Sequence, residues 1–167
     1  EGCNSTSNPP VAYTLTVESA PAVHVEGHTI YRFYVNMQDP TDKFSYVYGN
    51  DQDPLVINTP DGIFNSIVSG WSASGINPVF VTMFPELGLD EDSYATIGLD
   101  GPSGSSGLDG AADPSLVEDT SLSPTISQYF ETGGTSLNVN TFTSGAWYVL
   151  NTAANALPDA DMRVIVM

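Results

Sequence analysis

The chain has 167 residues, a length that suits one domain with a full hydrophobic core. It carries 20 Asp and Glu against 3 Lys and Arg, and the resulting formal charge of −17 excludes nucleic acid and anionic lipid as partners. Hydrophobic residues make up 41% of the chain, which argues against intrinsic disorder, and no apolar run approaches the ~20 residues that span a bilayer. We therefore predict a folded protein that does not insert into membranes.

The charge also indicates the environment of the protein. Only 14% of the residues are charged, so we expect an uncharged polar surface that carries isolated acids. A salty exterior screens the repulsion between such acids, and divalent cations bridge them. The chain begins with Glu1 and not with Met, from which we expect that a signal peptide has been removed. These features predict an extracellular or cell-surface location.

The composition changes after the first ten residues. Residues 1–10, EGCNSTSNPP, predict a flexible leader or linker, followed by a single β-sandwich domain at 11–167. Cys3 is the sole cysteine, which excludes an intrachain disulfide. Three states of Cys3 stay open: an exposed thiol, a link to another chain, and lipidation, although Glu1 and Gly2 do not match the usual lipidation pattern.

The first alternating run is VAYTLTV at 11–17, which predicts a strand. This strand would pair within its own domain or complete the sheet of a neighbouring copy. Strand addition of the second kind uses main-chain hydrogen bonds and pockets for alternate side chains. The candidate assembly residues are Cys3, Val11, Tyr13, Leu15 and Val17.

The stretch from Thr29 to Gly49 has the strongest strand pattern. Aromatic and β-branched side chains alternate with other residues from Thr29 to Met37, and a second alternating run from Phe44 to Tyr48 follows a turn at 39–42. One face of the first run consists of Tyr31, Phe33, Val35 and Met37. We predict a β-hairpin, or two adjacent strands, at the centre of an all-β domain.

The remaining pattern adds strands, long loops and one or two short helices. We expect strands at 55–57, 94–99, 137–142, 147–150 and 163–167, helices that begin at Asn77-Pro78 and Ser123-Pro124, and a long Gly/Ser loop at 100–113. This order is typical of a β-sandwich or jelly roll. The chain stops within its last expected strand, so we also expect that a final strand is absent.

From Thr29 onward the order of motifs is similar to a secreted β-rich domain of unassigned function that occurs in large surface and extracellular proteins of marine and aquatic bacteria. The motifs are TIYRFYVNMQDPTDKFSYVYGND, LVINTPDGIFNS, GINPVFVTMFPEL, DSYATIGLDGP and GAWYVLNTAANALPDADMRVIVM. The resemblance implies a role at a surface or in a matrix and names no activity. Proteins of this pattern continue past the last motif with one more β segment.

Acidic residues cluster at several expected turns. Ca²⁺ takes about six to eight oxygen ligands, and acidic loops at strand ends supply them. Our candidate calcium ligands are Asp51 with Asp53 and Asp90 with Asp92. None of these pairs has the EF-hand spacing, and the alternative for each is an ordinary solvated turn.

Two classes of function fit these observations. The first is a structural or adhesive subunit that meets other copies of itself or a surface component. The second is a calcium-dependent carbohydrate-binding module, with Trp71, Trp147 and the tyrosines as aromatic platforms for glycans. We expect no enzymatic activity, since no G-x-S-x-G turn is present; paired carboxylates leave a glycoside-acting enzyme as the alternative.

Overall fold

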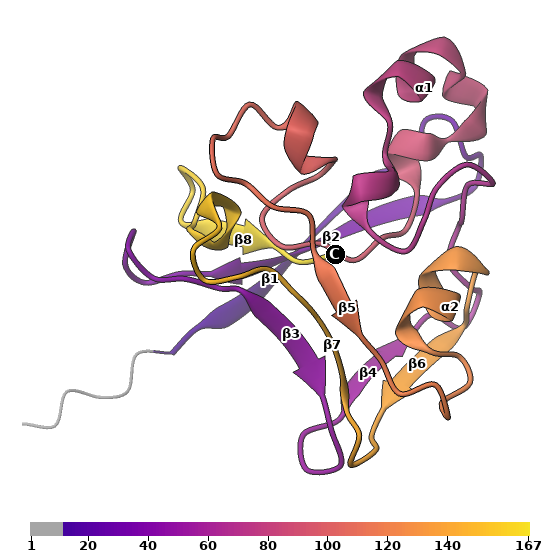
Figure 1. The fold of residues 1–167 in the computed structure, drawn as a ribbon. Coiled ribbons are helices and arrows are strands. Elements are labelled where there is room, and N and C mark those ends of the chain that lie inside the picture. Colours follow the sequence, from indigo (N-terminus) through magenta and orange to yellow (C-terminus); the bar gives the residue numbers. More distant parts are fainter. Residues whose placement is uncertain (1–11) are drawn as a thin grey trace, which may run out of the picture.

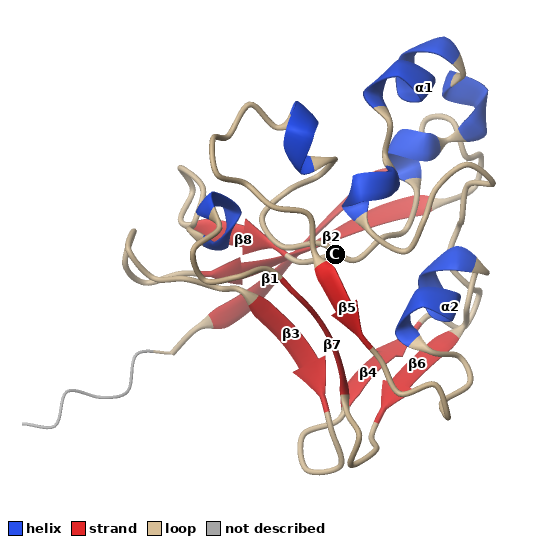
Figure 2. Cartoon of the chain, viewed as in Figure 1, coloured by secondary structure: helices blue, strands red, loops and turns tan. Residues whose placement is uncertain are grey.

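The structure, a computed structural model, describes residues 12–167 (Figures 1 and 2). Its strands are β1 (Thr14–Pro21), β2 (Thr29–Asn36), β3 (Tyr46–Gly49), β4 (Leu55–Asn58), β5 (Ser115–Val117), β6 (Ser136–Val139), β7 (Gly145–Tyr148) and β8 (Arg163–Ile165). Its α-helices are α1 (Pro78–Met83) and α2 (Ile126–Glu131), and short 3-10 turns lie at Ala73–Gly75, Pro85–Leu87, Leu89–Glu91, Ser103–Ser105 and Ala154–Ala156.

The strands form three small antiparallel sheets. Sheet A has the order β1-β2-β8, sheet B the order β3-β7-β5, and sheet C consists of β4 and β6. None of the three closes on itself within residues 12–167. The prediction of a β-rich protein with long loops and short helices is confirmed at this level, and the two-layered sandwich stays a prediction.

One main core joins the three sheets and α2. Its centre is aromatic: the rings of Phe130 and Trp147 meet edge to face, with centroids 6.1 Å apart. Trp147 is 2% exposed, and its indole N–H donates to the carbonyl of Thr96 at 3.1 Å. Burial of such rings contributes about 1.5–3 kcal/mol each. Phe33 and Val35, on one face of β2, pack against this core, whereas Tyr31 on the same face is 57% exposed.

The predicted central hairpin is wrong, because β2 and β3 belong to different sheets. After the turn at 39–42, the N–H of Phe44 bonds to the carbonyl of Ala156 at 2.8 Å, and the carbonyl of Ser45 accepts from Val149 at 2.9 Å. These two bonds direct β3 onto β7. Strand β2 is instead flanked by β1 and by β8, which comes from the far end of the chain.

The predicted strand at 94–99 is also wrong. Its backbone changes partners within a few residues: the N–H of Ala95 bonds to Trp71, whereas the N–H of Thr96 bonds to Val166. The segment therefore makes only an isolated bridge, between Ser72 and Ala95, although its side chains are buried. Strand β5, which follows the Gly/Ser loop, lacks a clear alternation over its three residues and had not been predicted.

The predicted starts of the two helices agree more closely with the structure than the predicted strands do. Asn77 caps α1, since its side-chain oxygen accepts the N–H of Val79 at 2.9 Å, and Pro78 is the first helical residue. Helix α2 begins at Ile126, after the predicted Ser123-Pro124. Its capping residue is Thr125, which forms a reciprocal capping box with Gln128.

Candidate functional site

Strand β1 lies at the edge of sheet A (Figure 1). It pairs with β2 over eight residues, from Thr14 opposite Asn36 to Pro21 opposite Thr29. The first strand therefore lies in the sheet of its own chain. It extends to Pro21, four residues beyond the strand expected at 11–17. Within residues 12–167 no strand pairs with the other side of β1.

The hydrogen bonds of β2 show which backbone groups of β1 face this open side. The N–H and the carbonyl of Phe33 both bond to residues 166–167 on the β8 side, each at 2.9 Å. Neighbours in an antiparallel ladder alternate in direction. Val17, which lies opposite Phe33, therefore points its own N–H and carbonyl away from β2.

The other end of the ladder gives the same result. The N–H of Ala22 donates to the carbonyl of His28 at 3.0 Å, so the even-numbered positions bond toward β2. Pro21 occupies an odd-numbered position, and its missing N–H removes no bond to β2. Leu15, Val17 and Ser19 therefore present the free backbone groups of this edge.

The two faces of β1 differ in how well they are covered. On the even face, Asn36 donates to the hydroxyls of Thr14 and Thr16 at 2.8 Å each, and Glu18 forms an ion pair with Arg163. On the odd face, Leu15 is 59% and Val17 47% exposed, although this is the side on which β2 packs against the main core. Within residues 12–167, the edge thus combines backbone groups that lack a strand partner with exposed apolar side chains.

The other strand edges are shorter or covered. Strands β3, β4, β5 and β6 have three or four residues each. On the far side of sheet A, Thr96 and Gly98 donate backbone hydrogen bonds to the segment at 165–166, and among the described residues β2 lacks a strand partner there only at residues 29–32. In the part of the chain that the structure describes, β1 is therefore the longest open edge.

The structure brings together three of the predicted assembly residues. Tyr13, Leu15 and Val17 follow one another along the odd face of the edge, and the hydroxyl of Tyr13 donates to Asp42 at 3.1 Å. Cys3 and Val11 lie outside the described residues. The sequence does not show which residues of β1 point their backbone groups to the open side, because this depends on the hydrogen-bond partners of β2.

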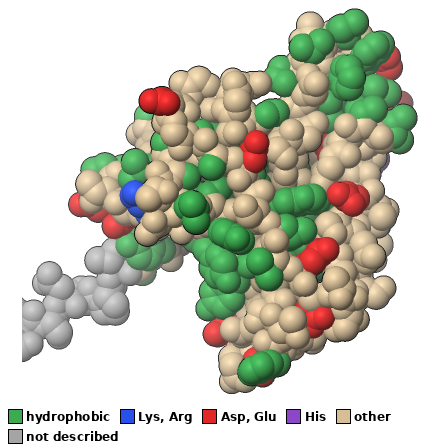
Figure 3. All heavy atoms as spheres, viewed as in Figure 1, with side chains coloured by type: hydrophobic (Ala, Val, Ile, Leu, Met, Phe, Trp, Pro, Cys, Tyr) green, Lys and Arg blue, Asp and Glu red, His purple; other side chains and the backbone are tan. Residues whose placement is uncertain are grey.

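A second exposed surface, the tyrosine face, consists of Tyr46, Tyr48 and Tyr148 on the outer side of sheet B. Hydrophobic side chains gather over β3 and β7 in Figure 3. The rings of Tyr46 and Tyr48 stack with centroids 5.2 Å apart and an interplanar angle of 29°, and Tyr148 lies 6.1 Å from Tyr46. Tyr46 and Tyr48 are 48% and 45% exposed. Stacked exposed rings are suited to contact the apolar faces of sugars.

The tryptophans do not provide such a surface. Trp147 is buried in the main core, so its predicted role as an exposed platform is wrong. Trp71 is half-buried and packs against the same core. Both indoles were drawn inward because each side chain buries more apolar area in the core than on a sheet surface.

The four predicted calcium ligands do not form one cluster. Asp51 and Asp53 are exposed in a turn that Asn50 caps by accepting the N–H groups of Gln52 and Asp53. Asp90 lies 3.5 Å from Nδ1 of His24. Among residues 12–167, no group of three or more His, Cys, Asp and Glu side chains gathers in a way that would hold a metal ion. Calcium binding stays a prediction.

Asp92, the fourth candidate, is buried. One carboxylate oxygen accepts the N–H of Ser66 at 2.7 Å, and the other has no hydrogen-bond partner among residues 12–167. Burial raises the pKa of Asp92 to about 6. The hydroxyl of Ser66 is also buried without a partner in the described residues.

Glu91, between these two aspartates, fixes the loop that joins β1 to β2. Its carboxylate accepts the backbone N–H groups of Val23, His24 and Val25, and its side chain is 4% exposed. Burial opposes ionisation of this carboxyl, but the three N–H donors and the nearby His24 lower the pKa of Glu91. The sequence marks Glu91 as one more turn acid and gives no sign of this role.

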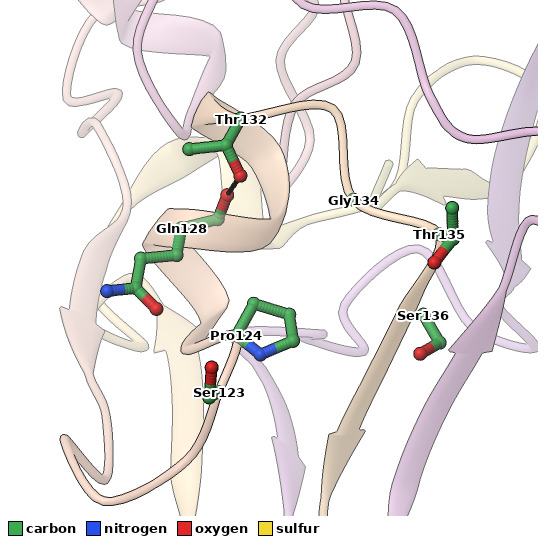
Figure 4. A pocket seen from close by; sticks show the side chains of 7 residues that line it. All are labelled: Ser123, Pro124, Gln128, Thr132, Gly134, Thr135 and Ser136. Atoms are coloured by element: carbon green, nitrogen blue, oxygen red, sulfur yellow. Dashed lines mark hydrogen bonds between the residues drawn. The ribbon is translucent and has the colours of Figure 1, made fainter.

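An open groove of about 390 Å³ lies beside α2 (Figure 4). Its lining consists of Ser123, Pro124, Gln128, Thr132, Gly134, Thr135 and Ser136. The hydroxyl of Thr132 donates to the backbone carbonyl of Gln128 at 2.6 Å. The groove therefore offers hydroxyl and amide groups without a titratable side chain.

A smaller, polar hollow of about 220 Å³ lies on the outer face of sheet A. Arg32, Tyr34, Asp100 and Asp159 are among the residues that line it. The guanidinium of Arg163, and not that of Arg32, lies over the ring of Tyr34, 4.3 Å from the ring centroid. Arg163 comes from β8, and the sequence does not show that this strand lies beside β2.

Comparisons with protein-family models, curated proteins and solved structures found no match for this chain. The resemblance to secreted domains of marine and aquatic bacteria therefore stays a prediction. No helix within residues 12–167 has the length and apolar character needed to cross a membrane.

Proposed function

We propose that this protein is a structural or adhesive subunit of an extracellular surface layer, matrix or filament, and that it associates through the edge of β1. The open, eight-residue edge with its uncovered Leu15 and Val17 carries this proposal. A sandwich-like arrangement of the sheets and a secreted location belong to the same proposal. The proposal includes no enzymatic activity.

The physical argument is that exposed strand edges are usually protected. Proteins keep such edges short, place charges on them, insert bulges or cover them. Among the described residues, strand β1 has none of these protections over residues 14–19; its one charge there, Glu18, is on the other face and is paired with Arg163. An edge of this kind pairs with another strand by main-chain hydrogen bonds.

The backbone direction of β1 provides a sharp test. Val17→Pro removes an N–H that points to the open side, so the bond pattern with β2 is kept. We expect its association constant to fall at least about tenfold, a change of about 1.4 kcal/mol. Val17→Thr is the matched control, because it keeps the N–H and the branched side chain. Light scattering and electron microscopy at high salt, with and without calcium, provide the measurement.

A second proline substitution tests which backbone N–H groups of β1 point toward β2 and which point to the open side. Thr16→Pro removes an N–H that bonds to β2, and we expect it to destabilise the fold by about 3 kcal/mol, whereas Val17→Pro costs much less. Equal losses of stability would contradict the assigned direction. A wild-type protein that remains monomeric at all concentrations, in every salt condition, would overturn the assembly proposal.

The tyrosine face favours a second candidate function, a calcium-dependent carbohydrate-binding module. Tyr46 and Tyr48 present stacked rings, with the ring of Tyr148 tilted beside them. The negative charge of the protein favours neutral sugars over anionic ones. A glycan array with Tyr48→Ala tests it. Tyr31→Ala is the control, since Tyr31 is exposed on another sheet. Equal binding by the two variants would count against the tyrosine face.

A further inference from the structure

The geometry points to a second copy of this chain as the partner of β1: two β1 strands pair antiparallel around a two-fold axis at Thr16. This inference rests on the proposed assembly function and specifies its partner and register. Three strands from each copy would then form one continuous sheet, β8-β2-β1 followed by β1-β2-β8.

The edges of sheet A decide whether assembly through this sheet stops at a dimer. A sheet with two open edges would add copies head to tail and grow into a fibre, whereas one open edge pairs only with its equivalent. On the far side of sheet A, β8 receives hydrogen bonds from Thr96 and Gly98 and covers β2 at residues 33–36, so β1 is the longest open edge of the sheet within the described residues. A pair of β1 strands uses this edge in both copies. Pairing at β1 therefore produces a closed dimer, and any larger assembly uses another surface of that dimer.

Charge favours a second copy at this place. Two bodies with a formal charge of −17 repel one another. Strand β1 is a locally neutral strip, because its single acid, Glu18, is ion-paired with Arg163. Salt that screens the remaining repulsion is expected to strengthen the dimer, whereas salt weakens contacts between opposite charges.

The register follows from the residues that face the open side. With the axis at Thr16, Leu15 of each copy lies beside Val17 of the other, so the exposed apolar side chains cover one another. Thr16 then faces Thr16, a favourable cross-strand pair.

Neighbouring registers are less favourable. An axis at Glu18 places the two Glu18 carboxylates opposite one another, and like charges in that position are destabilising. An axis at Val17 places Leu15 beside Ser19 and brings Pro21, which lacks an N–H, into the new ladder. The axis at Thr16 avoids both costs.

Disulfide cross-linking tests the register. Thr16→Cys and Thr14→Cys are a matched pair in the full chain with Cys3→Ser, because each replaces a threonine hydroxyl that accepts from Asn36 at 2.8 Å. In the proposed dimer the Cα atoms at position 16 are about 4.5 Å apart, within disulfide range. The two positions 14 are about four residues out of register, or roughly 13 Å apart.

We expect mild oxidation to convert most of Thr16→Cys into a covalent dimer and to leave Thr14→Cys mostly monomeric. Mixing Leu15→Cys with Val17→Cys is expected to give a cross-linked heterodimer. Cross-linking of Thr14→Cys and not of Thr16→Cys would overturn this register. Association of the wild-type protein without cross-linking at any β1 position would overturn the two-fold pairing and keep the proposed assembly function. A strict monomer would overturn both.

Discussion

Replacing Asp92 by Asn should stabilise this protein at neutral pH. Asp92 is 8% exposed, and one of its carboxylate oxygens has no hydrogen-bond partner among residues 12–167. Asparagine has the same shape and keeps an oxygen for the N–H of Ser66, but it has no charge to bury. An uncompensated buried charge is costly, so its removal is favourable.

The magnitude follows from the pKa of Asp92. Burial raises this pKa from 3.8 to about 6. At about 1.4 kcal/mol per pH unit, the charged form costs the folded state about 3 kcal/mol, which is an upper limit for the gain in Asp92→Asn. Between pH 3.8 and 6 the folded state keeps a proton that the unfolded state has lost. The free energy of unfolding therefore falls as pH rises through this window, and the cost is complete above about pH 6.

Urea unfolding of both proteins from pH 3 to 7.5 provides the measurement. We expect the advantage of Asp92→Asn to grow with pH and to level off above pH 6. Asp90→Asn is the control, because Asp90 is exposed two residues away and should change stability little. A variant that is less stable than the wild type at pH 7 would refute this reasoning.

The same experiment with calcium and with EDTA separates burial from metal binding. If Asp92 were a calcium ligand, calcium would stabilise the wild type and not the variant, since a ligand that binds only the folded state raises the free energy of unfolding. This outcome would support the predicted calcium site and contradict the account based on burial.

Two further substitutions test contacts that hold loops in place. Glu91→Gln should lower the free energy of unfolding by about 2–3 kcal/mol above pH 4.5, because the neutral amide of Gln accepts the three N–H groups less strongly. The pKa of Glu91 is lowered in the folded state, so we expect the difference between variant and wild type to shrink as pH falls below 4.5. Urea unfolding at a series of pH values provides the measurement. Asn155→Ala should cost about 3 kcal/mol or more by thermal unfolding, since Asn155 accepts from Ala112 at 2.9 Å and donates to Ile97 at 2.6 Å while buried. The exposed Asn151→Ala is its control, and equal losses would contradict the assigned hydrogen bonds.

The sequence by itself determined features that arise from neighbouring residues. Alternation identified β2 and placed Phe33 and Val35 on one face of it, because successive side chains of a strand point to opposite sides. Asn77 and Pro78 marked the start of α1, because a cap depends on the next two or three residues. Leu15 and Val17 lie on one side of β1 for the same reason as in β2, and their part in assembly stays a prediction.

The tertiary structure decided everything that depends on partners far away in the chain. Strand β2 pairs with β8 and not with β3, and the segment at 94–99 is buried without becoming a strand. The bonds between β2 and β8 decide which backbone groups of β1 face its open side. Asp92 differs from Asp90 because only Asp92 is buried. Partner choice and burial depend on which long-range contacts are most favourable together, and no short stretch of sequence records that competition.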